Sequence, residues 1–138
     1  MKHINNFNLY LESKKDKFPN YKKEEIDGFL VYVGKDAKSN DYLTFNICDV
    51  DDIWMHVKGV PGSHVVIKLK KASLTSSISI PTKDVIKKAA ELAKKNSKAS
   101  KLSGVSVVYC KRKFVKKRQG MNDGQVEVDY NNSEEIKV

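Results

Sequence analysis

Residues 52–67 read Asp52-Ile53-Trp54-Met55-His56-Val57-Lys58-Gly59-Val60-Pro61-Gly62-Ser63-His64-Val65-Val66-Ile67. Polar and apolar residues alternate on both sides of a Pro-Gly turn, a pattern typical of two strands that are each buried on one face. The segment therefore predicts a hairpin-like unit. Because side chains along a strand alternate between faces, Trp54, His56 and Lys58 share one face of the first strand.

His64 and Lys68 share one face of the second strand by the same rule. If the strands pair across the Gly59–Ser63 loop, both polar sets can lie on one side of the sheet, a hypothesis that depends on register. We expect Trp54, His56 and His64 to form a recognition face there. The apolar set opposite consists of Ile53, Met55, Val57, Val65 and Ile67.

Further strands are predicted from similar patterns. They cover residues 29–33, 42–47, 105–109 and 125–130, and residues 114–115 continue the sheet after a turn. Residues 34–41 are rich in turn formers and predict a polar connection. Residues 14–25 are charged, contain Pro19-Asn20 and predict a loop.

One main helix is predicted from Lys83 to about residue 100. Thr82 is a suitable N-cap, and Asp84 is placed favourably against the helix dipole. Residues 4–17 allow a short N-terminal helix. The order of elements predicts a single α+β domain, with a mostly antiparallel sheet. We place this domain at residues 28–130, between an N-terminal extension, 1–27, and a C-terminal tail, 131–138.

The charge balance indicates a polyanionic partner. The 138 residues contain 26 basic and 17 acidic side chains, a net charge of +9, which favours nucleic acid or an anionic membrane surface. A solvated lysine-rich surface is the alternative. The segment Lys94–Arg118 favours nucleic-acid binding over that alternative, because it carries ten basic residues and no acidic one.

The cysteine pattern and hydropathy indicate a soluble, cytoplasmic protein. Cys48 and Cys110 lie far apart and form no CxxC motif, so a structural disulfide is not implied. The first residues contain no long apolar run, so we expect no secretory signal. No segment approaches the roughly 20 apolar residues that a transmembrane helix needs, and we predict no membrane association.

Two interpretations of Trp54 remain open: it stacks on unpaired bases together with His56, or it packs in the core. Pro61-Gly62-Ser63 is either a tight turn or a phosphate cradle made of backbone N–H groups and the Ser63 hydroxyl. His56 and His64, with Asp52, suggest phosphodiester chemistry as an alternative function, but no nucleophile or paired-carboxylate motif completes the set.

Five residues carry groups that can bind a metal, but a metal site is not favoured because their spacing matches no zinc pattern. We predict no metal and no cofactor. The five residues are Cys48, Asp51, Asp52, His56 and His64.

The chain resembles the NFACT-R family, the C-terminal RNA-binding domain of NFACT ribosome-quality-control proteins. The segment from Asp52 to Val65 resembles its D-I-W-x-H-x-K-x-x-P-G-S-H-V signature, and Phe29–Asp41 its strand followed by V-G-R-N-A-x-x-N-D. The likeness covers roughly residues 28–128. Lys35 and Asp36 stand where Arg and Asn are usual, so a bidentate phosphate contact becomes a point charge. Arg118 and Asp123 stand where prolines are frequent.

The resemblance implies a stand-alone, non-catalytic module that binds tRNA or ribosomal RNA. Larger NFACT proteins bind the large ribosomal subunit carrying an obstructed peptidyl-tRNA and recruit tRNA for C-terminal tailing. We expect this chain to lack room for their N-terminal domain, helix-hairpin-helix motifs and coiled coil. RNA and the ribosome are therefore the expected partners. The predicted RNA contacts are Lys35, Asn40, Trp54, His56, Lys58, Ser63, His64, Lys68, Lys111, Lys113, Lys116, Lys117 and Arg118.

Overall fold

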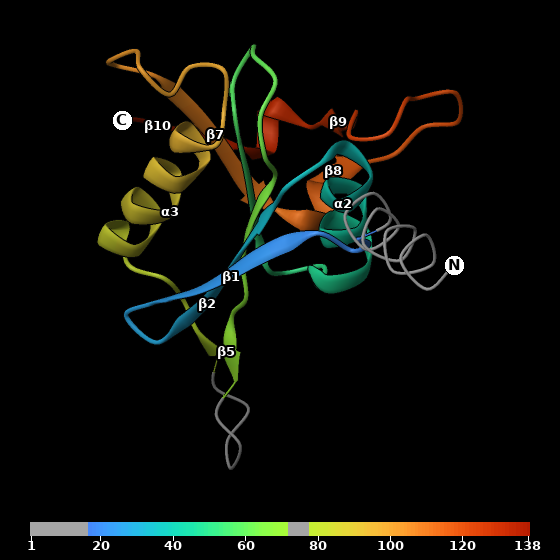
Figure 1. The fold of residues 1–138 in the computed structure, drawn as a ribbon. Helices are drawn as coiled ribbons and strands as arrows, with labels where there is room; N and C mark the ends of the chain where they lie inside the picture. Colours follow the sequence, from blue (N-terminus) through green and yellow to red (C-terminus); the bar gives the residue numbers. More distant parts are fainter. Residues whose placement is uncertain (1–16, 72–77) are drawn as a thin grey trace, which may run out of the picture.

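Six antiparallel strands form the central sheet of the computed structural model, which describes residues 17–71 and 78–138 (Figure 1). Their order in the sheet is β1-β2-β4-β3-β7-β10. The strands are β1 Tyr21–Ile26, β2 Phe29–Gly34, β3 Ile53–Val57, β4 Val65–Ile67, β7 Ser106–Lys111 and β10 Glu134–Lys137. Two small ribbons accompany the sheet: β5 Lys70–Lys71 with β6 Ile78–Ser79, and β8 Val115–Lys116 with β9 Glu127–Val128.

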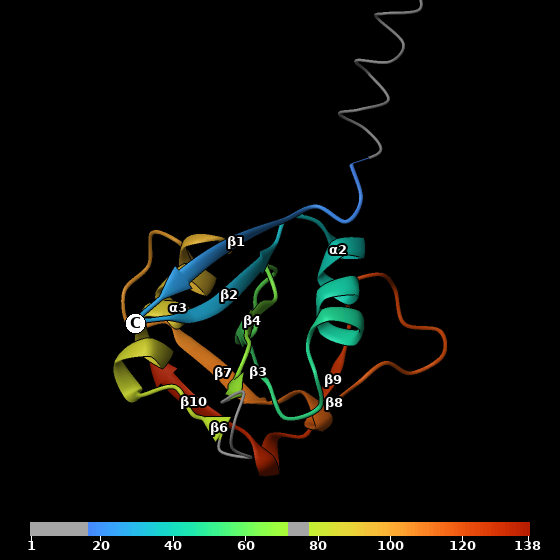
Figure 2. The same cartoon turned by 90° about the horizontal axis from the view of Figure 1, so that it is seen from below.

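Helical segments cover both faces of the sheet. Helix α3, Lys83–Lys95, lies on one side, whereas α2, Ala37–Tyr42, and the β8–β9 ribbon lie on the other (Figures 1 and 2). The π-helical turn η1, Leu43–Ile47, continues α2. Two short 3-10 turns are η2, Arg112–Phe114, and η3, Tyr130–Asn132. The predicted α+β fold with an antiparallel sheet and one main helix is confirmed.

The core under α3 contains the apolar set predicted for the hairpin. Met55, Val57, Val65 and Ile67 are buried against α3, and Ile53 packs against them with part of its surface exposed. The helix begins as predicted, because the Val85 N–H donates to the Thr82 hydroxyl across 3.3 Å. It ends at Lys95, before the predicted limit near residue 100.

The opposite face of the sheet carries a second buried cluster, which the sequence did not predict. Leu43, Trp54, Val66 and Val108 are its largest buried members. The alternation of residues 52–67 indicates a face in contact with solvent, but α2, η1 and the β8–β9 ribbon cover that face. The sheet is therefore buried on both sides over its central strands.

Residues 37–47 are helical, so the predicted strand at 42–47 and the predicted connection at 34–41 are wrong. The Asp36 carboxylate caps α2 by accepting a hydrogen bond from the Ser39 N–H at 2.7 Å. Leu43 and Thr44 are consecutive and both fully buried, which a helical turn allows and a strand with one buried face does not. Local capping and packing against the sheet thus override the alternating pattern.

Both ends of the described chain add edge strands to the sheet. Strand β1 lies within the segment predicted as loop and extension, and β10 within the segment predicted as tail. The predicted strand at 125–130 is reduced to the two residues of β9. The short helix allowed over residues 4–17 lies, except for Lys17, outside the described residues. None of the helices in residues 17–71 and 78–138 is long and apolar enough to cross a membrane.

Candidate functional site

A cleft of about 870 Å³ lies on the α2 side of the sheet, where the Gly59–Ser63 loop approaches the end of α3 and the segment 123–130. Seven of the predicted contact residues line it: Lys35, Asn40, Trp54, His56, Lys58, Ser63 and His64. Six do not: Lys68, Lys111, Lys113, Lys116, Lys117 and Arg118. The first group is brought together by the β3–β4 hairpin and the start of α2.

The register of β3 against β4 confirms that the two polar sets share one side of the sheet. Trp54 pairs with Val66 and Met55 with Val65, so His56 and His64 face the same way. The His56 and His64 rings meet edge to face, with 5.5 Å between centroids. The Trp54 ring lies nearly parallel to the His56 ring, at 6.1 Å and 12°.

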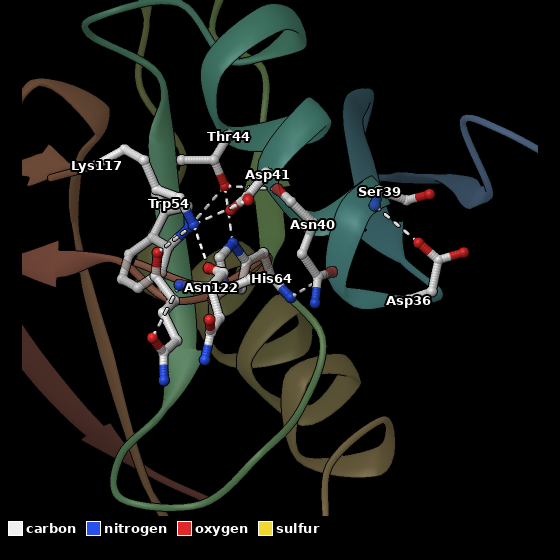
Figure 3. Close-up of polar contacts among 11 residues, drawn as sticks. Asp36, Ser39, Asn40, Asp41, Thr44, Trp54, His64, Lys117 and Asn122 are labelled. Carbon is white, nitrogen blue, oxygen red and sulfur yellow. Dashed lines mark hydrogen bonds and ion pairs between the residues drawn. The ribbon is translucent and has the colours of Figure 1, made fainter. Parts of the chain in front are cut away.

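Trp54 belongs to the core, so the prediction that it stacks on bases from an exposed face is wrong. Its side chain is 1% exposed, and its Nε1–H donates to the Thr44 hydroxyl at 3.1 Å. Figure 3 shows Trp54, Thr44 and His64 converging beneath α2. A buried tryptophan usually finds a partner for its N–H, and Thr44 supplies it here.

His64 is likewise buried, at 2% exposure. Its Nε2 lies 3.1 Å from the Gly124 carbonyl and its Nδ1 lies 2.8 Å from the Thr44 hydroxyl. A carbonyl can only accept, so Nε2 carries the proton and Nδ1 of the neutral ring is an acceptor. The single proton of the Thr44 hydroxyl has two acceptors within reach, this Nδ1 and the Asn40 carbonyl at 2.9 Å. Burial lowers the pKa of His64 to about 4, and the neighbouring His56 adds to the effect. His64 is therefore a neutral side chain that ties β4 to α2 and to the Gly124 segment.

Asn40 extends this network. Its side-chain carbonyl accepts a hydrogen bond from the His64 backbone N–H at 3.1 Å. Gly34 leaves space for this contact, because a Cβ at that position would lie only 1.9 Å from Asn40 Oδ1. Asn40 is 7% exposed. Its hydrogen bond to the His64 backbone helps to position the β3–β4 hairpin.

His56 is the half-buried ring at the cleft. Burial lowers its pKa, an effect that the backbone groups of Gly62 and Val57 oppose. The imidazole is therefore neutral at neutral pH and presents a polarisable ring without charge. Trp54 supports it from within the core.

The Pro61-Gly62-Ser63 turn uses its polar groups within the protein. The Ser63 hydroxyl donates to the Gly34 carbonyl at 2.5 Å, and the Ser63 N–H donates to the Asn96 carbonyl at 3.0 Å. Gly62 pairs with Ser97, and a Cβ on Gly62 would lie 2.7 Å from Ser97 Cβ. The tight-turn interpretation fits these contacts, and neither donor of Ser63 is available to a phosphate.

Three exposed lysines stand among the residues that line the cleft. Lys35 donates from Nζ to Asn96 Oδ1 at 3.2 Å, and Lys58 forms an ion pair with Glu135 at 2.6 Å. Lys98 was not among the predicted contacts, although it belongs to the basic segment Lys94–Arg118. The sequence also missed Tyr130, which ends the late alternating pattern and lies at the cleft.

Lys68 and Asp52 lie outside the cleft and bind each other. The Lys68 ammonium is 2.5 Å from Asp52 Oδ2, and the other oxygen of Asp52 accepts from the Leu69 N–H at 2.8 Å. Asp52 therefore does not join the two histidines. Over residues 17–71 and 78–138, no group of three or more His, Cys, Asp or Glu side chains is arranged to hold a metal ion.

The remaining basic residues acquire acidic neighbours from distant parts of the sequence. Lys111 and Lys113 lie 3.9 and 3.8 Å from Asp51, and Arg118 pairs with Glu127. The segment Lys94–Arg118 contains no acid, but among the described residues the fold gives an ion-pair partner to four of its ten cations: Lys111, Lys113, Lys117 and Arg118.

Lys117 ties the segment 122–125 to α2. It forms an ion pair with Asp41 at 2.9 Å, and its ammonium donates to the carbonyls of Asn122, at 2.5 Å, and Gln125, at 2.7 Å (Figure 3). Three oxygen acceptors match the three donors of an ammonium group. Lys117 thus holds one wall of the cleft in place.

Comparison with known proteins gives consistent results. The chain is 40% identical over 106 residues to the Rqc2 homolog RqcH of Bacillus subtilis, covering 77% of this chain and 17% of that protein. It is 31% identical over 111 residues to coiled-coil domain-containing protein 25 of Mus musculus, covering 80% of this chain and 50% of that protein. The chain therefore spans half or less of the length of these relatives.

A solved structure shares the fold. It is the C-terminal part of the fibronectin/fibrinogen-binding protein from Streptococcus suis, with a TM-score of 0.72 and 32% identity over 88% of this chain and 45% of that one. The family model described as "NFACT protein RNA binding domain" matches residues 17–130. The match includes β1, the hairpin, the cleft and Tyr130, and the chain therefore belongs to the NFACT RNA-binding domain family.

Proposed function

We propose that this chain is a non-catalytic RNA-binding module that holds RNA at the cleft. The observation that carries the proposal is the arrangement of Lys35, Lys58 and Lys98 around the half-buried, uncharged ring of His56. The net charge of +9 favours approach of a polyanion. The description of the family supports RNA as that polyanion.

The lysines are suited to phosphate contacts. Ammonium groups act as point charges and supply affinity that does not depend on base sequence. We expect a dissociation constant in the micromolar range, on the order of that of modules dominated by phosphate contacts. Lys58 must exchange its Glu135 partner for a phosphate, which is a small cost because both side chains are exposed.

We further propose that the RNA is tRNA or ribosomal RNA and that the chain acts in ribosome-associated quality control. The likeness to the Rqc2 homolog RqcH supports this proposal. Because the chain spans 17% of that protein, ribosome association needs its own test. Co-sedimentation with ribosomes stalled on a truncated message, compared with free subunits, measures it.

The alternative of phosphodiester cleavage receives less support. Asp52 is bound to Lys68, and His64 is buried with both ring nitrogens in contact with protein groups. Incubation of the chain with labelled tRNA and Mg²⁺ or Mn²⁺ tests this alternative. Cleavage by the parent that His56→Ala abolishes would overturn the non-catalytic assignment.

Binding is tested by fluorescence anisotropy with labelled tRNA and a ribosomal RNA fragment. His56→Ala and Lys35→Ala should weaken binding. Lys87→Ala is the matched control for charge, because Lys87 is exposed on α3 and does not line the cleft. If the control weakens binding as much as Lys35→Ala, the cleft is not the site, and failure of the parent to bind either RNA would reject the function.

A further inference from the structure

Tyr130 is an exposed aromatic residue at the edge of the cleft. Its side chain is 57% exposed, it lines the cleft, and it belongs to neither hydrophobic cluster. A large ring that is left outside the core on a small protein contributes little to stability by burial. The exposed ring is accessible to a ligand at the cleft.

The backbone that carries Tyr130 is held firmly. Tyr130 begins η3, and the preceding Asp129 caps this turn by accepting from the Asn131 N–H at 3.1 Å and from the Asn132 side chain at 2.7 Å. The Asp129 N–H donates to the Phe114 carbonyl at 2.9 Å. An exposed ring is thus presented from an ordered turn, which lowers the entropy cost of binding a ligand against it.

Lys58 links Tyr130 to His56. Its ammonium lies 5.5 Å from the centroid of the Tyr130 ring, and Lys58 follows His56 by two residues on the chain. The cleft therefore presents two uncharged rings with a cation beside them. Single-strand binders combine aromatic rings for bases with cations for the phosphates in the same way.

We propose that Tyr130 and His56 form a stacking surface for an unpaired nucleotide, with Lys58 bound to its phosphate. This inference rests on the proposed RNA binding and specifies its ligand as RNA that is single-stranded at the point of contact. A duplex hides the faces of its bases within the stack, so neither ring reaches them. A bulged, looped or terminal nucleotide exposes a face that both rings can contact.

The experiment uses a short RNA that contains one 2-aminopurine, offered either as a single strand or within a blunt duplex. Stacking on an aromatic ring quenches the fluorescence of this base. We expect tighter binding and stronger quenching with the single strand. Tyr130→Ala should weaken single-strand binding by about 5- to 150-fold, the range for loss of one base–aromatic stack, and should remove the quenching.

Two variants act as controls. Tyr130→Phe keeps the ring and should retain both affinity and quenching. Leu102→Ala removes another exposed apolar side chain, 61% exposed, that does not line the cleft, and it should have no effect. Far-ultraviolet circular dichroism of each variant establishes that it is folded.

The outcomes separate this inference from the proposed function. If the parent binds RNA but prefers the duplex, or if Tyr130→Ala binds the single strand like the parent, the stacking inference is wrong and RNA binding stands. If the parent binds neither form of the short RNA but binds tRNA or the ribosomal RNA fragment, the inference fails alone. If it binds none of these RNAs, the proposed function fails as well.

Discussion

Thr44 shows how one buried hydroxyl group determines the role of two residues that the sequence assigned to an exposed face. It accepts from Trp54 Nε1 at 3.1 Å and lies 2.8 Å from His64 Nδ1. Its own exposure is 0%. Both rings can be buried without a large desolvation cost, because Thr44 contacts the polar atom of Trp54 and one ring nitrogen of His64, and the Gly124 carbonyl contacts the other at 3.1 Å. The His56 ring interacts with the backbone groups of Gly62 and Val57 and is only half-buried at the cleft.

His64→Ala should therefore reduce the free energy of unfolding by about 2–4 kcal/mol, from the cavity and from the hydrogen bonds lost to Thr44 and Gly124. An exposed His64 on a recognition face, which the alternating pattern predicts, would instead be replaced with little loss of stability. His56→Ala serves as the comparison and should cost less, because His56 is only half-buried. Urea unfolding measures both. Equal and small losses would contradict a structural role for His64.

The lowered pKa of His64 predicts a loss of stability in mild acid. The unfolded chain binds a proton near the ordinary pKa of 6.5, whereas the folded chain does so only near 4. Stability therefore falls as the pH drops from about 6.5 towards 4, because the unfolded state binds more protons in that window.

Between pH 7 and pH 5 this group alone should remove about 2 kcal/mol from the free energy of unfolding. Urea unfolding at both pH values measures the change. His64→Gln lacks the titrating group. Its free energy of unfolding should therefore fall by about 2 kcal/mol less than that of the parent between pH 7 and pH 5. A variant with the same dependence as the parent would mean that His64 titrates normally.

Among the helices and strands, the sequence predicts correctly those whose periodicity and capping residues favour the same kind of element. It fails where periodicity and capping favour different kinds. Strands β3 and β4 and helix α3 combine periodicity with clear caps or turns. Residues 42–47 alternate like a strand, but the Asp36 cap begins a helix that runs through them. The second layer over Trp54 could not be predicted, because its members come from segments distant in sequence.

Lys117 holds the segment 122–125 in position. Substitution of Lys117 should therefore affect the structure of this segment more than the electrostatic attraction of RNA. Lys117→Ala removes three contacts, to Asp41, Asn122 and Gln125. It should speed hydrogen exchange in residues 118–126. Lys116→Ala is the control, since Lys116 is an adjacent exposed lysine without these contacts. If both variants exchange alike, Lys117 does not fasten this wall of the cleft.

Over the whole molecule, the composition shows that the protein is basic, but it does not show where the lysines that can contact a ligand lie. The basic segment Lys94–Arg118 was the strongest signal in the sequence, yet several of its cations meet acids such as Asp51 and Glu127 in the fold. The cleft gathers Lys35, Lys58 and Lys98 from three separate segments. Lys98 belongs to the basic segment, and Lys58 also meets an acid, Glu135, which a phosphate would have to replace. Only their assembly on the folded sheet reveals the grouping, which is why the candidate site was predicted in part.

This distribution predicts the salt dependence of RNA binding. Three phosphate contacts should give a slope of about −2.1 to −2.7 for the logarithm of the association constant against that of the salt concentration. Affinity should then fall roughly 20- to 40-fold for a fourfold increase in salt. Anisotropy titrations at several salt concentrations measure the slope.

Two lysine variants test which charges produce this salt dependence. Lys35→Ala should make the slope shallower by about 0.7–0.9, the contribution of one released counterion, whereas Lys87→Ala should leave it unchanged, because Lys87 lies on α3 away from the cleft. An equal change in both variants would indicate diffuse attraction by the net charge of +9. A flat dependence for the parent would remove the electrostatic basis of RNA binding altogether.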